Sequence, residues 1–152
     1  MLSLILMLIG GSPGSTAGGL KTTTIAVVVI AVFAMAKGGD DINTFKRRIV
    51  SDVVKQSAVI ILIYLFAVML SSMIICSVEG LGMSQVLFET ASAAGTVGVS
   101  KGITNQISVI SKIILMIMMY GGRIGGLSLV LVFGQRKPEA PVKRPTEQIL
   151  IG

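Results

Sequence analysis

Residues 57–78 read SAVIILIYLFAVMLSSMIICSV, a run of 22 residues without a charged side chain. An α-helix of about 20 such residues is long enough to cross the ~30 Å hydrocarbon core of a bilayer. Four basic residues between positions 46 and 55 precede this run, whereas the residues just after it carry only Glu79. Because basic residues mark the cytoplasmic side of membrane helices, the run is predicted to start in the cytoplasm and to cross outward.

The composition of the whole chain also indicates a membrane protein. Of the 152 residues, 53% are hydrophobic and only 13% are charged, about half of the ~25% found in an average soluble domain. The net charge of +6 comes from basic clusters beside apolar segments, which favours a membrane boundary over a nucleic-acid partner. The chain has no histidine, and its one cysteine, Cys76, excludes a disulfide or a cysteine metal site within the chain. Residues 1–9 lack the basic start and the cleavage site of a signal peptide.

Two further apolar stretches, residues 22–36 and 103–133, are predicted to be helices that cross the membrane inward. The first is short and needs a snorkelling Lys21 to span. Residues 37–56 are predicted to form a cytoplasmic connection. The basic, proline-rich residues 134–152 are predicted to form a disordered cytoplasmic tail.

Two short apolar stretches, residues 1–9 and 85–94, are each followed by a small-residue loop and then by a longer apolar segment. The loops are alike: TAG at 16–18 and TVG at 96–98 both have a lysine three residues further on. This similarity at a spacing of 80 residues indicates a repeat of helix, short re-entrant helix, Thr-x-Gly loop and helix. The first copy lacks its leading helix, so we expect the chain to be truncated at its N-terminus.

A Thr-x-Gly loop that follows a half-helix is typical of a cation selectivity filter. Non-helical backbone at membrane depth must be buried in protein or line an aqueous cavity. In such a loop, consecutive carbonyl oxygens replace the hydration shell of the ion. Glycine permits the backbone angles that this requires, and the C-terminal end of the half-helix favours a cation.

Two other interpretations of the loops stay open. Residues 14–22, GSTAGGLKT, nearly match the phosphate-binding pattern G-x-x-x-x-G-K-[ST], but Leu20 separates Gly19 from Lys21 and no strand precedes the motif. Alternatively, both loops are ordinary turns outside the membrane, which are often rich in glycine, serine and threonine.

Arg123 is the one charge deep inside a predicted membrane helix, within YGGRIGG at residues 120–126. Such a charge costs at least about 2.5–3.5 kcal/mol, so it is predicted to face a cavity or a partner. One interpretation is a barrier to cations on the ion path, and the other is a brace between two helices. Glu89 is a candidate partner for Arg123 or a support for the filter backbone. Glu79 and Glu89 make a poor acid–base pair, and no catalytic residue is apparent.

Three separated motifs resemble the Trk/Ktr/HKT superfamily of potassium transporters, most closely the Ktr-type bacterial membrane subunit. Residues 10–24, GGSPGSTAGGLKTTT, resemble its third pore loop, and residues 87–100, LFETASAAGTVGVS, resemble the fourth. Residues 122–125, GRIG, resemble the arginine-bearing segment of the last helix. The chain departs from the family pattern at Gly126, where proline is common, and at Ala94, where a bulky aromatic residue is common.

The resemblance implies an all-α membrane protein in which four helix–pore-loop–helix repeats surround one pore. Residues 1–36 would then end repeat three, 37–56 would connect the repeats, 57–133 would form a complete repeat four and 134–152 the tail. The implied function is potassium uptake across the plasma membrane by a multi-pass protein with a cytoplasmic C-terminus. The filter would include Ser15, Thr16, Ala17, Gly18, Thr96, Val97 and Gly98, with Arg123 as the pore barrier and Glu89 as a candidate filter support.

The resemblance further implies the ions and partners. Potassium is the transported ion and sodium a candidate coupled ion, while no covalently bound cofactor and no enzymatic activity are expected. The implied partners are a second copy in a homodimer, the missing repeats, a cytoplasmic nucleotide-binding regulatory ring and the lipid bilayer. A four-sided filter needs four loops and this chain has two. The alternative is therefore a non-conducting fragment or scaffold that needs a partner chain to complete the pore.

Overall fold

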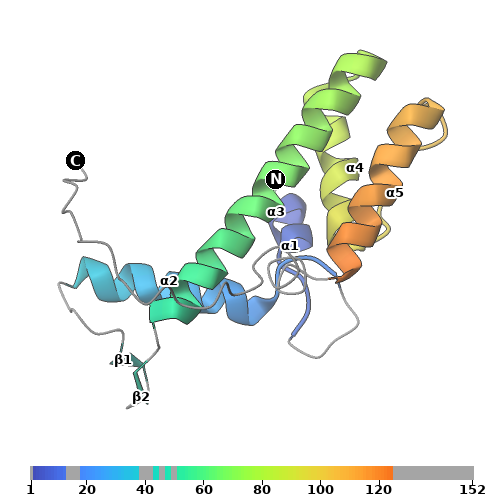
Figure 1. Cartoon of the computed structure of the whole chain (residues 1–152). Helices are drawn as coiled ribbons and strands as arrows, with labels where there is room; N and C mark the ends of the chain where they lie inside the picture. The colour runs from blue at the N-terminus through green and yellow to red at the C-terminus, as the bar shows by residue number, and fades with distance from the viewer. Residues whose placement is uncertain (1, 13–17, 38–42, 45–46, 49–50, 125–152) are drawn as a thin grey trace, which may run out of the picture.

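The computed structural model describes residues 2–12, 18–37, 43–44, 47–48 and 51–124. These residues form five helices and one short pair of strands (Figure 1). In chain order the elements are α1 (Leu2–Leu8), α2 (Thr22–Ala36), β1 (Asn43–Thr44), β2 (Arg47–Arg48), α3 (Ser51–Glu79), α4 (Met83–Gly95) and α5 (Val109–Ile124). The described part is therefore mostly helical, as expected for an all-α membrane protein, and the repeat arrangement stays a prediction.

Helix α3 has the length and composition of a membrane span. Its 29 residues extend over about 44 Å at ~1.5 Å per residue, which exceeds the ~30 Å hydrocarbon core. The predicted run of residues 57–78 lies within it, and the helix begins six residues earlier, at Ser51. Residues 52–79 are the one stretch among the described residues that is long and apolar enough for a span. Large apolar side chains such as Leu62 and Phe66 are exposed on it, which suits contact with lipid.

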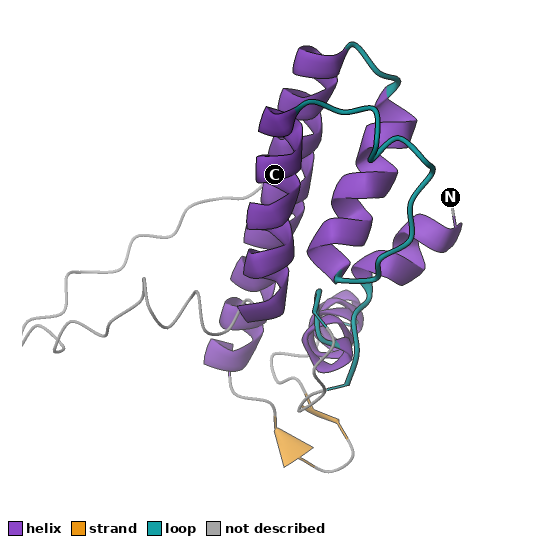
Figure 2. Ribbon diagram, turned by 90° about the vertical axis from the view of Figure 1, so that its right-hand side faces the viewer, coloured by secondary structure: helices purple, strands orange, loops and turns teal. Residues whose placement is uncertain are grey.

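The core lies where α3, α4 and α5 pack together (Figure 1). Its buried apolar residues come from these helices and from the loop before α5: Ile75, Val86, Ala93, Ile103, Ile107 and Leu115. Helix α4 is the central element, because all of its residues from Glu89 to Gly95 are buried. Figure 2 shows the α4–α5 loop returning along α4. The short helix α1 also packs against α4.

Two buried hydroxyl groups join α3 to α4 inside this core. The hydroxyl oxygens of Ser72 and Thr90 lie 2.6 Å apart, and both residues are fully buried. The Ser72 hydroxyl also donates a hydrogen bond to the carbonyl oxygen of Val68 at 2.7 Å. Hydrogen bonds of this kind between membrane helices are worth about 0.6–2 kcal/mol. The pair therefore fixes the position of α4 along α3.

Helix α2 has the predicted bounds but not the predicted direction relative to α3. Figure 1 shows α2 lying across the N-terminal end of α3, and residues from the first turns of both helices line one pocket. The predicted topology places these two ends on opposite sides of the membrane. A parallel bridge between Ile9 and Leu20 places the start of α2 beside the end of α1.

The last helix begins later than the hydropathy of residues 103–133 predicts. Residues 103–108 form turns, and α5 starts at Val109. The apolar residues Ile103 and Ile107 are buried in the core as part of these turns. Residues 125–133, which complete the predicted helix, lie outside the described residues, as does the predicted tail, residues 134–152. The two-residue strands β1 and β2 pair antiparallel within the predicted connection, residues 37–56.

Candidate functional site

The two Thr-x-Gly motifs meet in space although they lie far apart in the sequence. The backbone N–H of Gly18 donates a hydrogen bond to Thr96 Oγ1 at 2.9 Å, across 78 residues of sequence. Thr96 directly follows α4, and Gly18 lies in the loop that leads to α2. The other predicted filter residues of the first motif, Ser15, Thr16 and Ala17, lie outside the described residues. The structure thus brings together the last residue of one motif and the first residue of the other.

Thr96 has a backbone conformation that is unusual for its residue type. Its φ of 53° and ψ of 35° lie in the left-handed region, where glycine is the common residue. The Thr96 N–H donates to the Ala93 carbonyl at 3.1 Å, and the Val97 N–H donates to the Ser92 carbonyl at 3.0 Å. This pair of bonds is the Schellman motif that ends many helices. A left-handed residue with a Cβ costs about 1–2 kcal/mol, and the hydrogen bond from Gly18 offsets part of this strain.

Glycine is required at position 18 by its neighbours. An ideal Cβ on Gly18 would lie 2.5 Å from Thr96 Oγ1 and 3.0 Å from the carbonyl oxygen of Gly122. The next residue, Gly19, has a φ of +79°, which side chains rarely adopt. Gly18 and Gly19 therefore allow the first loop to approach both α4 and α5 closely.

The end of α1 and the residues that follow it contact both Leu20 and the end of α4. The Gly10 N–H donates to the Leu20 carbonyl at 2.7 Å, and the Leu20 N–H donates to the Leu8 carbonyl at 3.4 Å. At the end of α4, an ideal Cβ on Gly95 would lie 2.5 Å from the carbonyl oxygen of Met7. The last turn of α1 and the end of α4 are thus in backbone contact.

The C-terminal end of α5 completes the arrangement. The Gly19 N–H donates to the Gly122 carbonyl at 3.3 Å. The loop that leads to α2, the end of α4 and the end of α5 meet here. We call this meeting point the loop junction; its residues are Gly18, Gly19, Gly95, Thr96 and Gly122. Arg123 follows Gly122 directly, in the last turn of α5, and its side chain is exposed.

Glu89 lies in α4 and holds the segment that follows the second motif. Its carboxylate accepts a hydrogen bond from the Ser100 hydroxyl, one from the Lys101 N–H at 3.0 Å and one from the Thr104 hydroxyl at 3.3 Å. Glu89 is buried, whereas Val97 and Gly98 are exposed. Of the two partners that the sequence left open for Glu89, the structure places it against residues 100–104 and not against Arg123.

The Lys101 side chain lies beside Phe88 of α4. Its ammonium group is 5.0 Å from the centre of the Phe88 ring, which is within the range of a cation–π interaction. This contact adds a second link between α4 and the segment that Glu89 holds.

Sequence reasoning missed the role of Glu79. This carboxylate, at the end of α3, accepts hydrogen bonds from the Ser108 N–H at 2.8 Å and from the hydroxyls of Ser108 and Ser111. The Ser111 N–H in turn donates to Ser108 Oγ at 3.4 Å, so Ser108 caps α5. A serine immediately before an apolar run was the available signal for this helix start.

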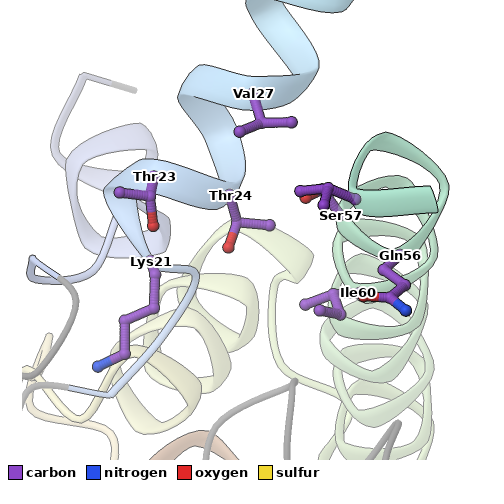
Figure 3. Close-up of a pocket in the computed structure, with 8 residues that line it drawn as sticks. Lys21, Thr23, Thr24, Val27, Gln56, Ser57 and Ile60 are labelled. Atoms are coloured by element: carbon purple, nitrogen blue, oxygen red, sulfur yellow. The ribbon is translucent and has the colours of Figure 1, made fainter. Parts of the chain in front are cut away.

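A pocket of about 280 Å³ lies where α2 and α3 begin (Figure 3). It is lined by Lys21, Thr23, Thr24, Val27, Val53, Gln56, Ser57 and Ile60. Figure 3 shows the Lys21 ammonium group directed away from Gln56 and Ser57. Across the residues that the structure describes, no group of three His, Cys, Asp or Glu side chains could hold a metal ion. The loop junction, where the two Thr-x-Gly motifs meet, is the candidate site.

Comparison with known proteins identifies a family and several relatives. The family model described as TrkH, cation transport protein, matches residues 1–143. The Ktr system potassium uptake protein D of Bacillus subtilis is 37% identical over 97% of this chain and 33% of its own length. The potassium/sodium uptake protein NtpJ of Enterococcus hirae is 38% identical over 100% of this chain and 35% of its own length. The Ktr system potassium uptake protein B of Vibrio alginolyticus is 32% identical over 100% of this chain and 33% of its own length. The chain thus spans about a third of the length of these curated relatives.

Proposed function

The chain belongs to the TrkH family of cation transport proteins, and from this premise we propose that it contributes two loops of a potassium-selective filter. The family consists of membrane transporters and not of enzymes. The observation that carries the proposal is the hydrogen bond from the Gly18 N–H to Thr96 Oγ1, which joins the two Thr-x-Gly loops.

The chemistry of the loop junction suits a dehydrated cation. Carbonyl oxygens of consecutive loop residues replace the water around potassium in known filters. Helix α4 ends at the junction, so its partial negative charge lies beside the second loop and favours a cation there. The filter residues of this proposal are Ser15, Thr16, Ala17 and Gly18 in the first loop and Thr96, Val97 and Gly98 in the second.

Glu89 acts in this proposal as the support of the second loop. It receives three hydrogen bonds from residues 100–104, which begin two residues after Gly98. A buried carboxylate with three donors holds that segment at a fixed distance from α4. The position of the loop carbonyls then depends on Glu89 although its side chain does not contact the ion.

Arg123 acts in this proposal as a barrier to cation passage. Its side chain is exposed on α5, one residue after the glycine that contacts the first loop. A positive charge close to the inner side of a cation filter raises the energy of an ion that passes. The bracing role is the competing interpretation of this residue.

The complete transporter requires more loops than this chain carries. We propose that the chain is an N-terminally truncated part, and that the missing repeats supply the other two sides of the filter. The proposed protein spans the plasma membrane several times, has a cytoplasmic C-terminus and forms a homodimer in the lipid bilayer with a cytoplasmic nucleotide-binding regulatory ring. Sodium is proposed as a coupled ion because one relative is named a potassium/sodium uptake protein.

Potassium-uptake rescue tests this function. A bacterial strain without its own potassium importers is grown on limiting potassium with the 152-residue chain, or with that chain joined to the segment encoded immediately upstream, here called the extended chain. Rescue by the extended chain alone supports the proposal and assigns the fragment a non-conducting role. Failure of both, with both proteins found in the membrane, contradicts potassium transport. Rescue by the 152-residue chain alone contradicts the proposal that this chain needs further loops to conduct.

A further inference from the structure

The end of α5 contacts the loop junction through a residue without a side chain, Gly122. Its carbonyl accepts the Gly19 N–H at 3.3 Å. An ideal Cβ on Gly122 would overlap the carbonyl oxygen of Ala94 and lie 2.9 Å from the carbonyl carbon of that residue. Gly122 is buried, and the Ala94 carbonyl belongs to the last turn of α4. Position 122 therefore touches the backbone of the first loop at Gly19 and of the last turn of α4 at Ala94, just before the second loop.

The neighbouring glycine has no such contact. An ideal Cβ on Gly121 would meet no atom within 4 Å. Both residues lie in the last turns of the same helix, where glycine is less favourable than alanine by about 0.8–1 kcal/mol. The contacts with Gly19 and Ala94 explain glycine at position 122, while nothing in the described residues explains it at position 121.

We propose that Gly122 is a positioning residue that sets the ion selectivity of the two loops. The close contact of α5 with Ala94 determines the position of the Gly122 carbonyl. Through its hydrogen bond, that carbonyl determines the position of Gly19 and of the adjacent Gly18. Arg123 follows directly, so a displacement of the helix end at Arg123 moves the backbone of the first loop. This inference rests on the proposed potassium filter and adds a residue of α5 that controls its geometry.

Two pairs of variants of the extended chain test this role. The first pair is Gly122→Ala and its control Gly121→Ala, which gain the same methyl group in the same helix turn. The second pair is Gly19→Ala and its control Gly80→Ala. Both glycines of this pair have a positive φ, of +79° and +65°, but Gly80 has no atom within 4 Å of an ideal Cβ. Gly19→Ala thus disturbs the donor of the same hydrogen bond without adding an atom to α5.

The readout is the ratio of potassium to sodium uptake in cells that contain equal amounts of each variant. We expect Gly122→Ala and Gly19→Ala to lower this ratio by about tenfold, which corresponds to ~1.4 kcal/mol of discrimination, and both controls to keep it. Gly122→Ala with the wild-type ratio overturns the inference. If Gly122→Ala does not accumulate, Gly19→Ala decides, and an unchanged ratio there overturns it equally. A wild-type extended chain that transports no potassium overturns the proposed function and this inference together.

Discussion

The Thr96 hydroxyl oxygen lies 2.9 Å from the backbone nitrogen of Gly18 and accepts its hydrogen bond. Threonine at this position is conformationally unfavourable, since the left-handed backbone there suits glycine. Strained residues of this kind persist where surrounding contacts hold them, and they gather at functional sites. The Thr96 hydroxyl links the two loops. The same residue therefore carries both the unfavourable backbone conformation and the hydrogen bond between the loops.

Substitution of Thr96 by valine should destabilise the protein more than substitution by serine. Valine keeps the shape but leaves the Gly18 N–H without its acceptor, which costs about 1–3 kcal/mol. Serine keeps the acceptor and removes one branch of the side chain. The melting temperatures of the extended chain purified in detergent measure this difference, and equal values for the two variants would show that the hydrogen bond contributes nothing.

Substitution of Gly18 by alanine should destabilise the loop junction through a clash with Thr96. The new Cβ would lie 2.5 Å from Oγ1 and 2.6 Å from Cγ2 of Thr96. Combining Gly18→Ala with Thr96→Gly should therefore be less damaging than the sum of the two changes, with a coupling energy of about 0.5–3 kcal/mol. A double-mutant cycle of unfolding free energies measures this coupling, and strict additivity would place the two residues out of contact.

Substitution of Glu89 by glutamine should lower potassium uptake while the protein still accumulates. The amide oxygen can still accept from Ser100 and Lys101, which share Oε1, but the amide nitrogen in place of Oε2 cannot accept from the Thr104 hydroxyl. The amide also carries no charge, and a hydrogen bond to a charged group is worth about 1.5–3 kcal/mol. The control is Gln85→Glu, on the exposed part of the same helix. Uptake of E89Q at the wild-type rate would contradict the supporting role.

Substitution of Ser72 by alanine should weaken the contact between α3 and α4. The Thr90 hydroxyl would lose a partner 2.6 Å away inside the core, and the expected loss of stability is about 0.6–2 kcal/mol. Ser77→Ala, at an exposed position of the same helix, provides the control. Thermal unfolding of both variants measures the effect, and equal melting temperatures would mean that the buried pair does not stabilise the helix contact.

Substitution of Arg123 by alanine in the extended chain should raise potassium flux, because the change removes a positive charge from the proposed ion path. Flux per molecule distinguishes the two interpretations of this residue when it is normalised to the amount of protein in the membrane. Unchanged flux with reduced accumulation would support the bracing role instead. Lys112→Ala, also in α5 but far from the loop junction along the helix, controls for the loss of a charge.

Local sequence signals predicted the helices well. The uncharged run of residues 57–78 lies inside α3, and the short apolar stretches near residues 1–9 and 85–94 form α1 and α4. These features depend on length and composition within one segment. Hydropathy could not distinguish the turn of residues 103–108 from a helix, because Ile103 and Ile107 are apolar and buried in either case.

The spatial relationships depend on contacts between distant residues, and the sequence pattern does not contain them. The bond between Gly18 and Thr96 crosses 78 residues, and the bridge between Ile9 and Leu20 joins the segments on either side of the first motif. The repeat suggested that the two loops are related, but not which atoms join them. The loop glycines were predicted to provide backbone freedom, whereas at Gly18 the structure shows a steric requirement as well.

The most direct test of the central claim is ion flux through the purified extended chain in liposomes. Potassium uptake is measured with sodium at a low concentration, which supplies the proposed coupled ion, and then with sodium in large excess. If the two joined loops form part of a potassium filter, potassium enters at nearly the same rate in both conditions, and the Gly98→Ala variant loses this preference. Equal competition by sodium in the wild-type protein, or a selectivity that the filter substitution does not change, would contradict the account.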